Sequence, residues 1–69
     1  MIEVFKTDVQ KISQANKLIA LLHQHFPNIK INFDLQDCDK ILRVEGVNFI
    51  AEKVTLLVKE NGFVCKMLE

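Results

Sequence analysis

Strict alternation of apolar and polar residues from Ile29 to Leu35 constrains the fold more than any other feature of this sequence. Every second residue is apolar and the residues between are polar: Ile29, Ile31, Phe33 and Leu35 against Lys30, Asn32 and Asp34. A period of two places the apolar side chains on one side of a strand and the polar side chains on the other. The sequence therefore predicts a strand over residues 29–35 with one buried face.

Two other segments have the spacing of amphipathic helices. In the first, apolar residues recur every three or four positions from Ile12 to Phe26, and Pro27 ends the pattern. The second is expected to open at Asn48, a favourable N-cap residue, and to end at Asn61-Gly62, which can supply a left-handed C-terminal cap. The predicted inner stripes are Ile12, Ala15, Leu18, Ile19, Leu22 and Phe26 in the first helix and Ile50, Ala51, Val54, Leu57 and Val58 in the second.

Three more segments are predicted to be strands. Residues 1–7 mix β-branched and aromatic residues, residues 40–45 form the return strand of a hairpin, and residues 63–68 form a last strand. The whole chain, residues 1–69, is then one α+β domain with the ferredoxin-like order βαββαβ. We expect a four-stranded antiparallel sheet with two helices on one face and the first strand in the middle.

The charge balance argues against several classes of function. The chain of 69 residues carries nine Lys plus Arg and nine Asp plus Glu, so it lacks the basic excess of a nucleic-acid-binding protein. No apolar run approaches the roughly 20 residues that span a bilayer, so no membrane insertion is expected. Met1 to Phe5 do not resemble a secretory signal, and we expect a cytoplasmic protein.

Cys38 and Cys65 match no disulfide or Cys-x-x-Cys pattern and are expected to be free thiols.

No group of residues has the spacing of a catalytic centre. The sequence contains no Ser-His-Asp or Cys-His arrangement with motif support, no glycine-rich phosphate loop and no acidic metal cage. It therefore favours a protein that is not an enzyme.

Three short segments resemble a known family. Phe5-Lys6-Thr7-Asp8-Val9 is similar to the first strand and the apolar residue beneath the metal loop of heavy-metal-associated domains, which occur in copper chaperones and copper-transporting ATPases. Phe26-Pro27-Asn28-Ile29 resembles that family's Leu-Pro-Gly-Val helix end, and Asn61-Gly62-Phe63 resembles its Gly-Tyr pair before the last strand. The resemblance covers the whole chain and implies the same ferredoxin-like fold.

The metal motif of that family is altered in this sequence. Family members carry Met-x-Cys-x-x-Cys after the first strand, and the two thiolates hold Cu(I). Aligning Val9 with the Met places Lys11 and Gln14 at the two cysteine positions. A protonated amine has no lone pair to donate, and its charge opposes a cation. The resemblance therefore implies the fold without the metal chemistry, and no cofactor is expected.

Other residues leave open an unconventional site for copper or zinc, and with it a function in heavy-metal binding or transport. Cys38 lies in the predicted hairpin turn between Asp37 and Asp39, at the same end of the sheet as the altered loop. One thiolate beside carboxylates mixes soft and hard ligands, however. His23 and His25 end the first helix, but a spacing of two places them on different helix faces. A favourable interaction of imidazolium with the helix C-terminus also explains them.

Three further polar residues have structural explanations. Cys65 alternates with Val64 and Lys66 and is expected to face the helices as a small apolar side chain. Thr7 and Gln10 fit a capping box at the start of the first helix.

The sheet face away from the helices is expected to be apolar. The resemblance turns five side chains inward: Phe5, Leu42, Val44, Phe63 and Met67. On the open face it leaves Ile2, Val4, Ile41, Val64 and Leu68, beside Lys6, Arg43 and Lys66. A shift of register in the first strand would instead turn Ile2 and Val4 inward and Phe5 outward.

Apolar patches of this kind mark partner surfaces. The sequence therefore predicts a function through protein contacts. A protein partner or a second copy would bind on the open face, or add to the second or the fourth strand, which are the predicted edges of the sheet.

Overall fold

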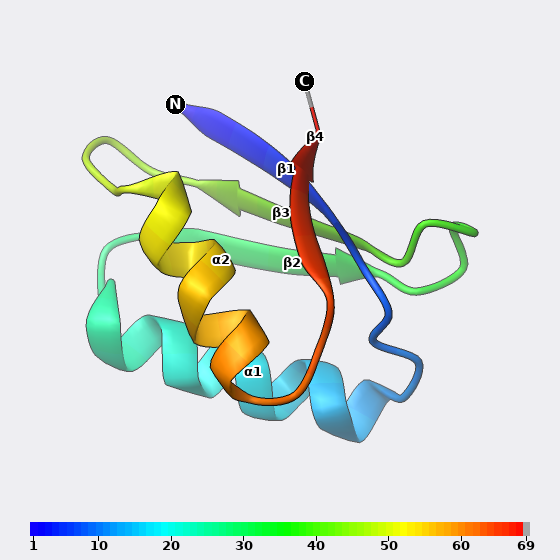
Figure 1. Cartoon of the computed structure of the whole chain (residues 1–69). Helices are drawn as coiled ribbons and strands as arrows, with labels where there is room; N and C mark the ends of the chain where they lie inside the picture. The colour runs from blue at the N-terminus through cyan, green and yellow to red at the C-terminus, as the bar shows by residue number, and fades with distance from the viewer. Residues whose placement is uncertain (69) are drawn as a thin grey trace.

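In the computed structural model, which describes residues 1–68, four strands and two helices follow one another along the chain (Figure 1). In chain order they are β1 (Ile2–Thr7), α1 (Ile12–His25), β2 (Lys30–Asp34), β3 (Ile41–Glu45), α2 (Ala51–Glu60) and β4 (Cys65–Leu68). The predicted α+β class is confirmed, with two helices and a four-stranded antiparallel sheet. β2, β3 and β4 are slightly shorter than the sequence patterns suggested.

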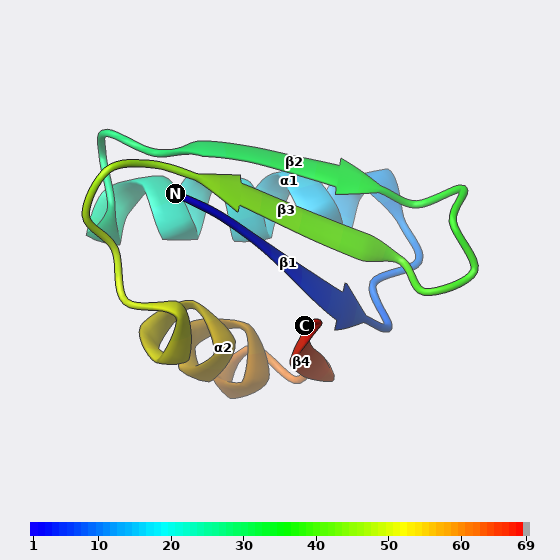
Figure 2. The same ribbon diagram turned by 90° about the horizontal axis from the view of Figure 1, so that it is seen from above.

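The strand order in the sheet is β2-β3-β1-β4, and each strand is antiparallel to its neighbours. β1 therefore lies inside the sheet, as the sequence predicted. β2 and β4 are the edges, and Figure 2 shows the outer side of β2 free of other segments. In this register, Val4 on β1 lies opposite Arg43 on β3 and Leu68 on β4.

The hydrophobic core lies between the two helices and one face of the sheet (Figure 1). Phe5, Leu42 and Val44 are fully buried, whereas their strand neighbours Lys6 and Arg43 are exposed. The helices contribute the buried side chains Ala15, Leu18 and Leu22 from α1 and Val54 and Val58 from α2. The burial of Phe5 decides the register of β1: Phe5 points toward the helices, and Val4 lies on the opposite face.

Two residues assigned to the inner stripes are in fact exposed. Ile12 is 73% exposed and Ile50 is 51% exposed. Ile12 is the first residue of α1 and Ile50 precedes α2, so both lie ahead of the first buried residues of their helices, Ala15 and Val54. The periodicity identified the helices correctly but did not show where their packing against the sheet begins.

The two side chains expected to turn inward from the last strand are only partly buried. Phe63 is half-buried against the core. Met67 borders Ala51 and Thr55 of α2 but remains 37% exposed, because β4 is at the edge of the sheet.

The start of α1 differs from the prediction. Lys11 is the N-cap residue, and Oε1 of Gln14 accepts hydrogen bonds from the backbone N–H groups of Lys11 (3.2 Å) and Gln10 (3.4 Å). The predicted capping box of Thr7 and Gln10 is therefore wrong. Thr7 still belongs to β1, and its hydroxyl donates a hydrogen bond to the carbonyl of Lys40 instead.

Asn48 is not the N-cap of α2. The helix begins at Ala51, and its N-cap is Ile50, whose side chain can form no capping hydrogen bond. The carbonyl of Ile50 accepts hydrogen bonds from the N–H groups of Lys53 (3.0 Å) and Val54 (3.4 Å). Helix formation here depends on the burial of Val54 and Val58 rather than on a polar cap.

The C-terminal cap of α2 is confirmed. Gly62 has a φ of +91°, in the left-handed region. Its N–H donates to the carbonyl of Lys59 (3.0 Å), and the N–H of Phe63 donates to the carbonyl of Val58 (3.4 Å). These two bonds form the Schellman motif, which satisfies carbonyls that the helix end would otherwise leave free.

Candidate functional site

Three loops meet at one end of the sheet. The end of β1 is joined to the β2–β3 hairpin by a hydrogen bond from the N–H of Thr7 to the carbonyl of Asp39 (3.1 Å). The loop after β1 is joined to the segment before β4 by the N–H of Val64, which donates to Oδ1 of Asp8 (2.8 Å). We call this region, residues 7–11, 36–40 and 61–64, the loop end. It brings the loop after β1, which contains Val9 and Lys11, next to the hairpin that contains Cys38.

Val9, Lys11 and Gln14, which the family resemblance would align with the metal motif, lie before and at the start of α1. Val9 is fully buried, and its N–H donates to Oγ1 of Thr7 (3.2 Å). Lys11 is exposed, and its ammonium group can only donate hydrogen bonds. Oε1 of Gln14 accepts a hydrogen bond from the backbone of Lys11 (3.2 Å). Val9 anchors the loop and Gln14 closes the helix start, and none of the three side chains is a thiolate, imidazole or carboxylate.

Among residues 1–68, one group of potential metal ligands lies in the hairpin turn. Sγ of Cys38 and the carboxylate oxygens of Asp37 and Asp39 lie within 4.8 Å of one another. Oδ1 of Asp37 accepts a hydrogen bond from the N–H of Asp39 (2.8 Å), and Oδ1 of Asp39 lies 3.5 Å from Nζ of Lys6. Cys38 is an exposed free thiol. The group offers one soft and two hard ligands, and the neighbouring ammonium opposes a cation.

The two histidines lie far along α1 from the loop end and do not converge. Nε2 of His23 donates a hydrogen bond to the carbonyl of Ile29 (3.0 Å) and so links the end of α1 to the start of β2. His25 is exposed. Neither belongs to a group of potential metal ligands among the described residues.

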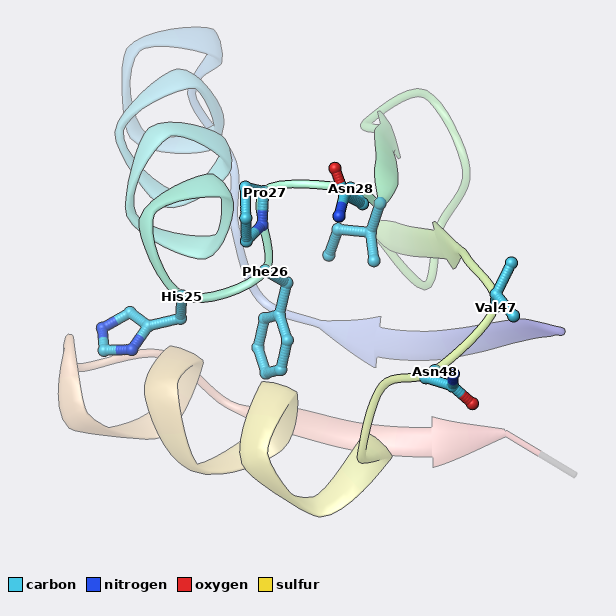
Figure 3. A pocket seen from close by; sticks show the side chains of 7 residues that line it. His25, Phe26, Pro27, Asn28, Val47 and Asn48 are labelled. Atoms are coloured by element: carbon cyan, nitrogen blue, oxygen red, sulfur yellow. The ribbon is translucent and has the colours of Figure 1, made fainter.

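His25 instead borders a pocket that the sequence did not predict (Figure 3). The pocket lies between the end of α1 and the loop that follows β3, and it is lined by His25, Phe26, Pro27, Asn28, Ile29, Val47 and Asn48. Val47 is 85% exposed. One imidazole and two carboxamides supply its polar side chains, and this set contains neither a nucleophile with its base nor a metal cage.

Cys65 is a buried thiol, as expected. It is 2% exposed. Burial raises the pKa of its thiol, and the hydrogen bond with Thr55 and the charge of Lys59 act in the opposite direction. A thiol held protonated in apolar surroundings is a poor nucleophile and a poor metal ligand.

The sheet face opposite the helices carries the predicted apolar side chains, which we call the open-face patch. Ile2 and Val64 are 57% exposed, Leu68 is 38% exposed, and Val4 and Ile41 are half-buried. Val4 and Leu68 lie opposite each other on neighbouring strands. Val64 precedes β4 and lies at the loop end.

Basic side chains accompany the open-face patch. Arg43 lies opposite Val4, and Lys6 lies opposite both Ile41 and Lys66. Lys6 is paired with Asp39, and no other ion pair is found within residues 1–68. Acidic side chains border the patch as well, since Glu45 lies opposite Ile2 and Asp34 lies opposite Ile41. The patch therefore combines apolar contact area with charges of both signs.

α1 and the edge strand β2 line a groove that sequence reasoning missed. We call it the β2 groove, and its lining residues are Ile12, Asn16, Ile19, Asn32, Phe33, Asp34, Leu35 and Gln36. Ile12 and Ile19 stand seven positions apart, about two helical turns, and therefore lie on the same side of α1. That spacing was the available signal, but a groove forms only because the fold places this side of α1 next to β2.

Comparisons with protein-family models, with curated proteins and with solved structures find no match to this chain. Among residues 1–68, neither helix has the length and apolar character that crossing a lipid bilayer requires. Functional proposals for this chain therefore depend on its own geometry.

Proposed function

We propose that this chain is a non-enzymatic, cytoplasmic domain of the ferredoxin-like fold that works through protein contacts on the open face of its sheet. The element order and the strand order β2-β3-β1-β4 support this fold. Each helix connects a central strand with an edge strand, β1 with β2 and β3 with β4, which is the interleaved pattern of the split βαβ arrangement.

The same proposal relates the domain to the heavy-metal-associated family, with the metal ligands lost. The buried position of Val9 beneath the loop and the left-handed Gly62 before the last strand support the relation. Lys11 and Gln14 stand where the cysteines would be, and Gln14 is bonded to the backbone of the helix start. In this proposal the former metal loop has become a structural connection.

The exposure of the open-face patch is the observation that carries the proposed function. The core and both helices lie on the other side of the sheet, so no helix or strand within residues 1–68 packs on this side, and Val4 and Leu68 keep part of their surface in water. Burial of apolar area stabilises a complex by roughly 25 cal/mol per Å² before the costs of association. Charges of both signs border the patch, so the partner surface is expected to carry carboxylates opposite Arg43 and Lys66 and a basic group opposite Glu45.

A pull-down with two immobilised forms of the domain, which differ at one open-face residue, tests this proposal. The wild-type domain and a Val4→Asp variant are immobilised and exposed to the same extract, and a partner is expected to be retained only by the wild type. With that partner purified, Val4→Asp and Ile41→Asp should each raise the dissociation constant at least about tenfold, as the loss of apolar contact and an unpaired interface charge imply. Lys17→Asp, on an exposed position of α1, is the control and should leave binding unchanged. Equal binding by wild type and Val4→Asp would exclude the open face as the docking surface.

The group of Asp37, Cys38 and Asp39 favours a second candidate function, the binding or transport of copper or zinc. Titration with Cu(I) or Zn²⁺ against a competing chelator tests it, with glutathione as the reference thiol. Affinity well above that of glutathione, lost in Cys38→Ser and retained in Cys65→Ser, would favour the metal function over docking. Affinity equal to that of glutathione would reject it.

A further inference from the structure

The outer edge of β2 carries a charge pattern that is complementary to itself. The strand reads Lys30-Ile31-Asn32-Phe33-Asp34, with a cation at one end, a carboxylate at the other and an amide midway. In an antiparallel copy of the same strand centred on Asn32, Lys30 lies opposite Asp34 of the second copy. In the same register, Ile31 lies opposite Phe33 of the second copy.

From this pattern we infer that two copies of the chain associate through their β2 edges and form one continuous antiparallel sheet. β2 is an edge strand with no further strand on its outer side, and an edge presents a row of backbone N–H and C=O groups that pairing would satisfy (Figure 2). A two-fold axis through Asn32 makes the interface isologous, so each contact occurs twice. The interface then contains two Lys30–Asp34 ion pairs.

The β2 groove supplies a second, independent argument for the same occupant. Ile12 on its rim is 73% exposed, and Ile19, Phe33 and Leu35 are only half-buried. Paired strands of one sheet share their two faces, so the second β2 places its own Ile31 and Phe33 on the groove side. Association covers apolar surface that a single copy leaves in water.

The charge register favours a second copy in this antiparallel arrangement over other pairings. A parallel copy of β2 would set Lys30 against Lys30 and Asp34 against Asp34, which is repulsive. The other edge, β4, reads Cys65-Lys66-Met67-Leu68 and has no complementary charge to offer to a copy of itself. The inferred dimer therefore uses β2 and leaves the open-face patch and β4 free.

Charge reversal and charge exchange test the inference by sedimentation equilibrium at low ionic strength. Lys30→Asp and Asp34→Lys should each weaken self-association at least about tenfold, since each variant sets like charges together at two places in the interface. The double variant Lys30→Asp/Asp34→Lys restores opposite charges and should return to within about threefold of wild type. An equimolar mixture of the two single variants should form mixed dimers, because one strand is then acidic at both ends and the other is basic.

The exchange variant and the mixture keep the test valid if a single variant loses stability. Lys30 lies opposite Glu45 on β3, so Lys30→Asp also adds repulsion within one copy. The double variant retains that repulsion, and its recovery would therefore report the interface alone. Lys66→Asp on β4 is the matched control and should leave the dimer unchanged.

Three results would overturn the inference. One is a wild-type chain that stays monomeric at protein concentrations up to about 1 mM, because any self-association would then be too weak to matter. Another is a dimer that none of the charge variants weakens. The third is a dimer that Val4→Asp dissociates and Lys30→Asp does not, which would assign self-association to the open face. Loss of partner capture by Val4→Asp with an intact dimer would separate this interface from the proposed docking function.

Discussion

The hydroxyl of Thr7, at the end of β1, donates a hydrogen bond to the carbonyl of Lys40, 33 residues further along the chain. Thr7 is 5% exposed, and its Oγ1 also accepts a hydrogen bond from the N–H of Val9 (3.2 Å). One buried hydroxyl thus connects the central strand, the hairpin and the loop that leads into α1. Lys40 has a φ of +46°, so this contact holds a residue in a conformation that favours glycine.

Thr7→Val is expected to lower the free energy of unfolding by about 2 kcal/mol. It keeps the shape of the side chain but leaves the partly buried carbonyl of Lys40 and the buried N–H of Val9 without their partner. Thr7→Ser keeps the hydroxyl and should cost less than about 1 kcal/mol. Urea unfolding followed by circular dichroism measures both. Equal losses in the two variants would mean that the methyl group of Thr7, not its hydroxyl, stabilises this region.

Gly62→Ala is expected to lower the free energy of unfolding by about 1 kcal/mol through backbone strain. The space around Gly62 is open, since a Cβ there would meet no atom within 4 Å, and its φ is +91°. Steric crowding therefore contributes nothing. Gly62→Asn should cost less, because Asn tolerates the left-handed region better than Ala does. A Gly62→Asn variant less stable than Gly62→Ala would contradict this explanation.

Gly46 shows the opposite case, in which space rather than backbone angle requires glycine. A Cβ at Gly46 would lie 2.6 Å from Cγ2 of Ile29 and 3.4 Å from Cδ1 of Phe49. Gly46→Ala is therefore expected to cost about 1 to 3 kcal/mol by overpacking.

Ile29→Ala removes the clashing methyl group and supplies a double-mutant cycle for this prediction. Gly46→Ala should be less harmful in the Ile29→Ala background than in the wild type, by at least about 0.5 kcal/mol. Strict additivity in thermal or urea unfolding would argue that the cost arises from the backbone instead.

The buried thiol of Cys65 predicts a loss of stability at alkaline pH. The pKa of Cys65 is raised in the folded chain, chiefly by burial, whereas in the unfolded chain the thiol keeps its ordinary, lower pKa. The folded state then binds the proton more tightly, so the contribution of Cys65 to stability is complete below the unfolded pKa and is lost as the pH rises through the folded pKa.

Urea midpoints measured across the alkaline range should therefore fall more steeply with pH in the wild type than in Cys65→Ala. Cys38→Ala is the control, because Cys38 is exposed and its removal should leave the wild-type slope intact. A Cys65→Ala variant with the wild-type slope would assign the pH dependence to other groups.

The regular elements could be predicted because their patterns are repeated many times along the chain. Several residues contribute to each pattern, namely the alternation from Ile29 to Leu35 and the buried series Ala15, Leu18 and Leu22. One residue that departs from a pattern therefore does not change the predicted element. The two helix starts could not be predicted in the same way. The side chains of the two N-cap residues, Lys11 and Ile50, make no capping hydrogen bond. Neither residue type is among those usually found at an N-cap.

A candidate surface could be predicted only where its residues belong to individual strands whose pattern is visible in the sequence. Alternation within β1 and β4 predicts which side chains share a face, and the family resemblance assigns Val4 and Leu68 to the open one. The burial of Phe5 confirms this assignment for β1. The β2 groove does not, because it depends on Ile12 and Phe33 coming together from different elements. The charge pattern of Lys30 and Asp34 is visible in the sequence, but its meaning depends on β2 being an edge.

The pairing of Val4 with Leu68 has a consequence for how this chain reaches its native state. β4 completes one side of β1, so β1 gains its second neighbour only once synthesis has passed Leu68. The antiparallel pairing of β1 with β3 needs the chain only as far as Glu45, so it can form earlier in synthesis.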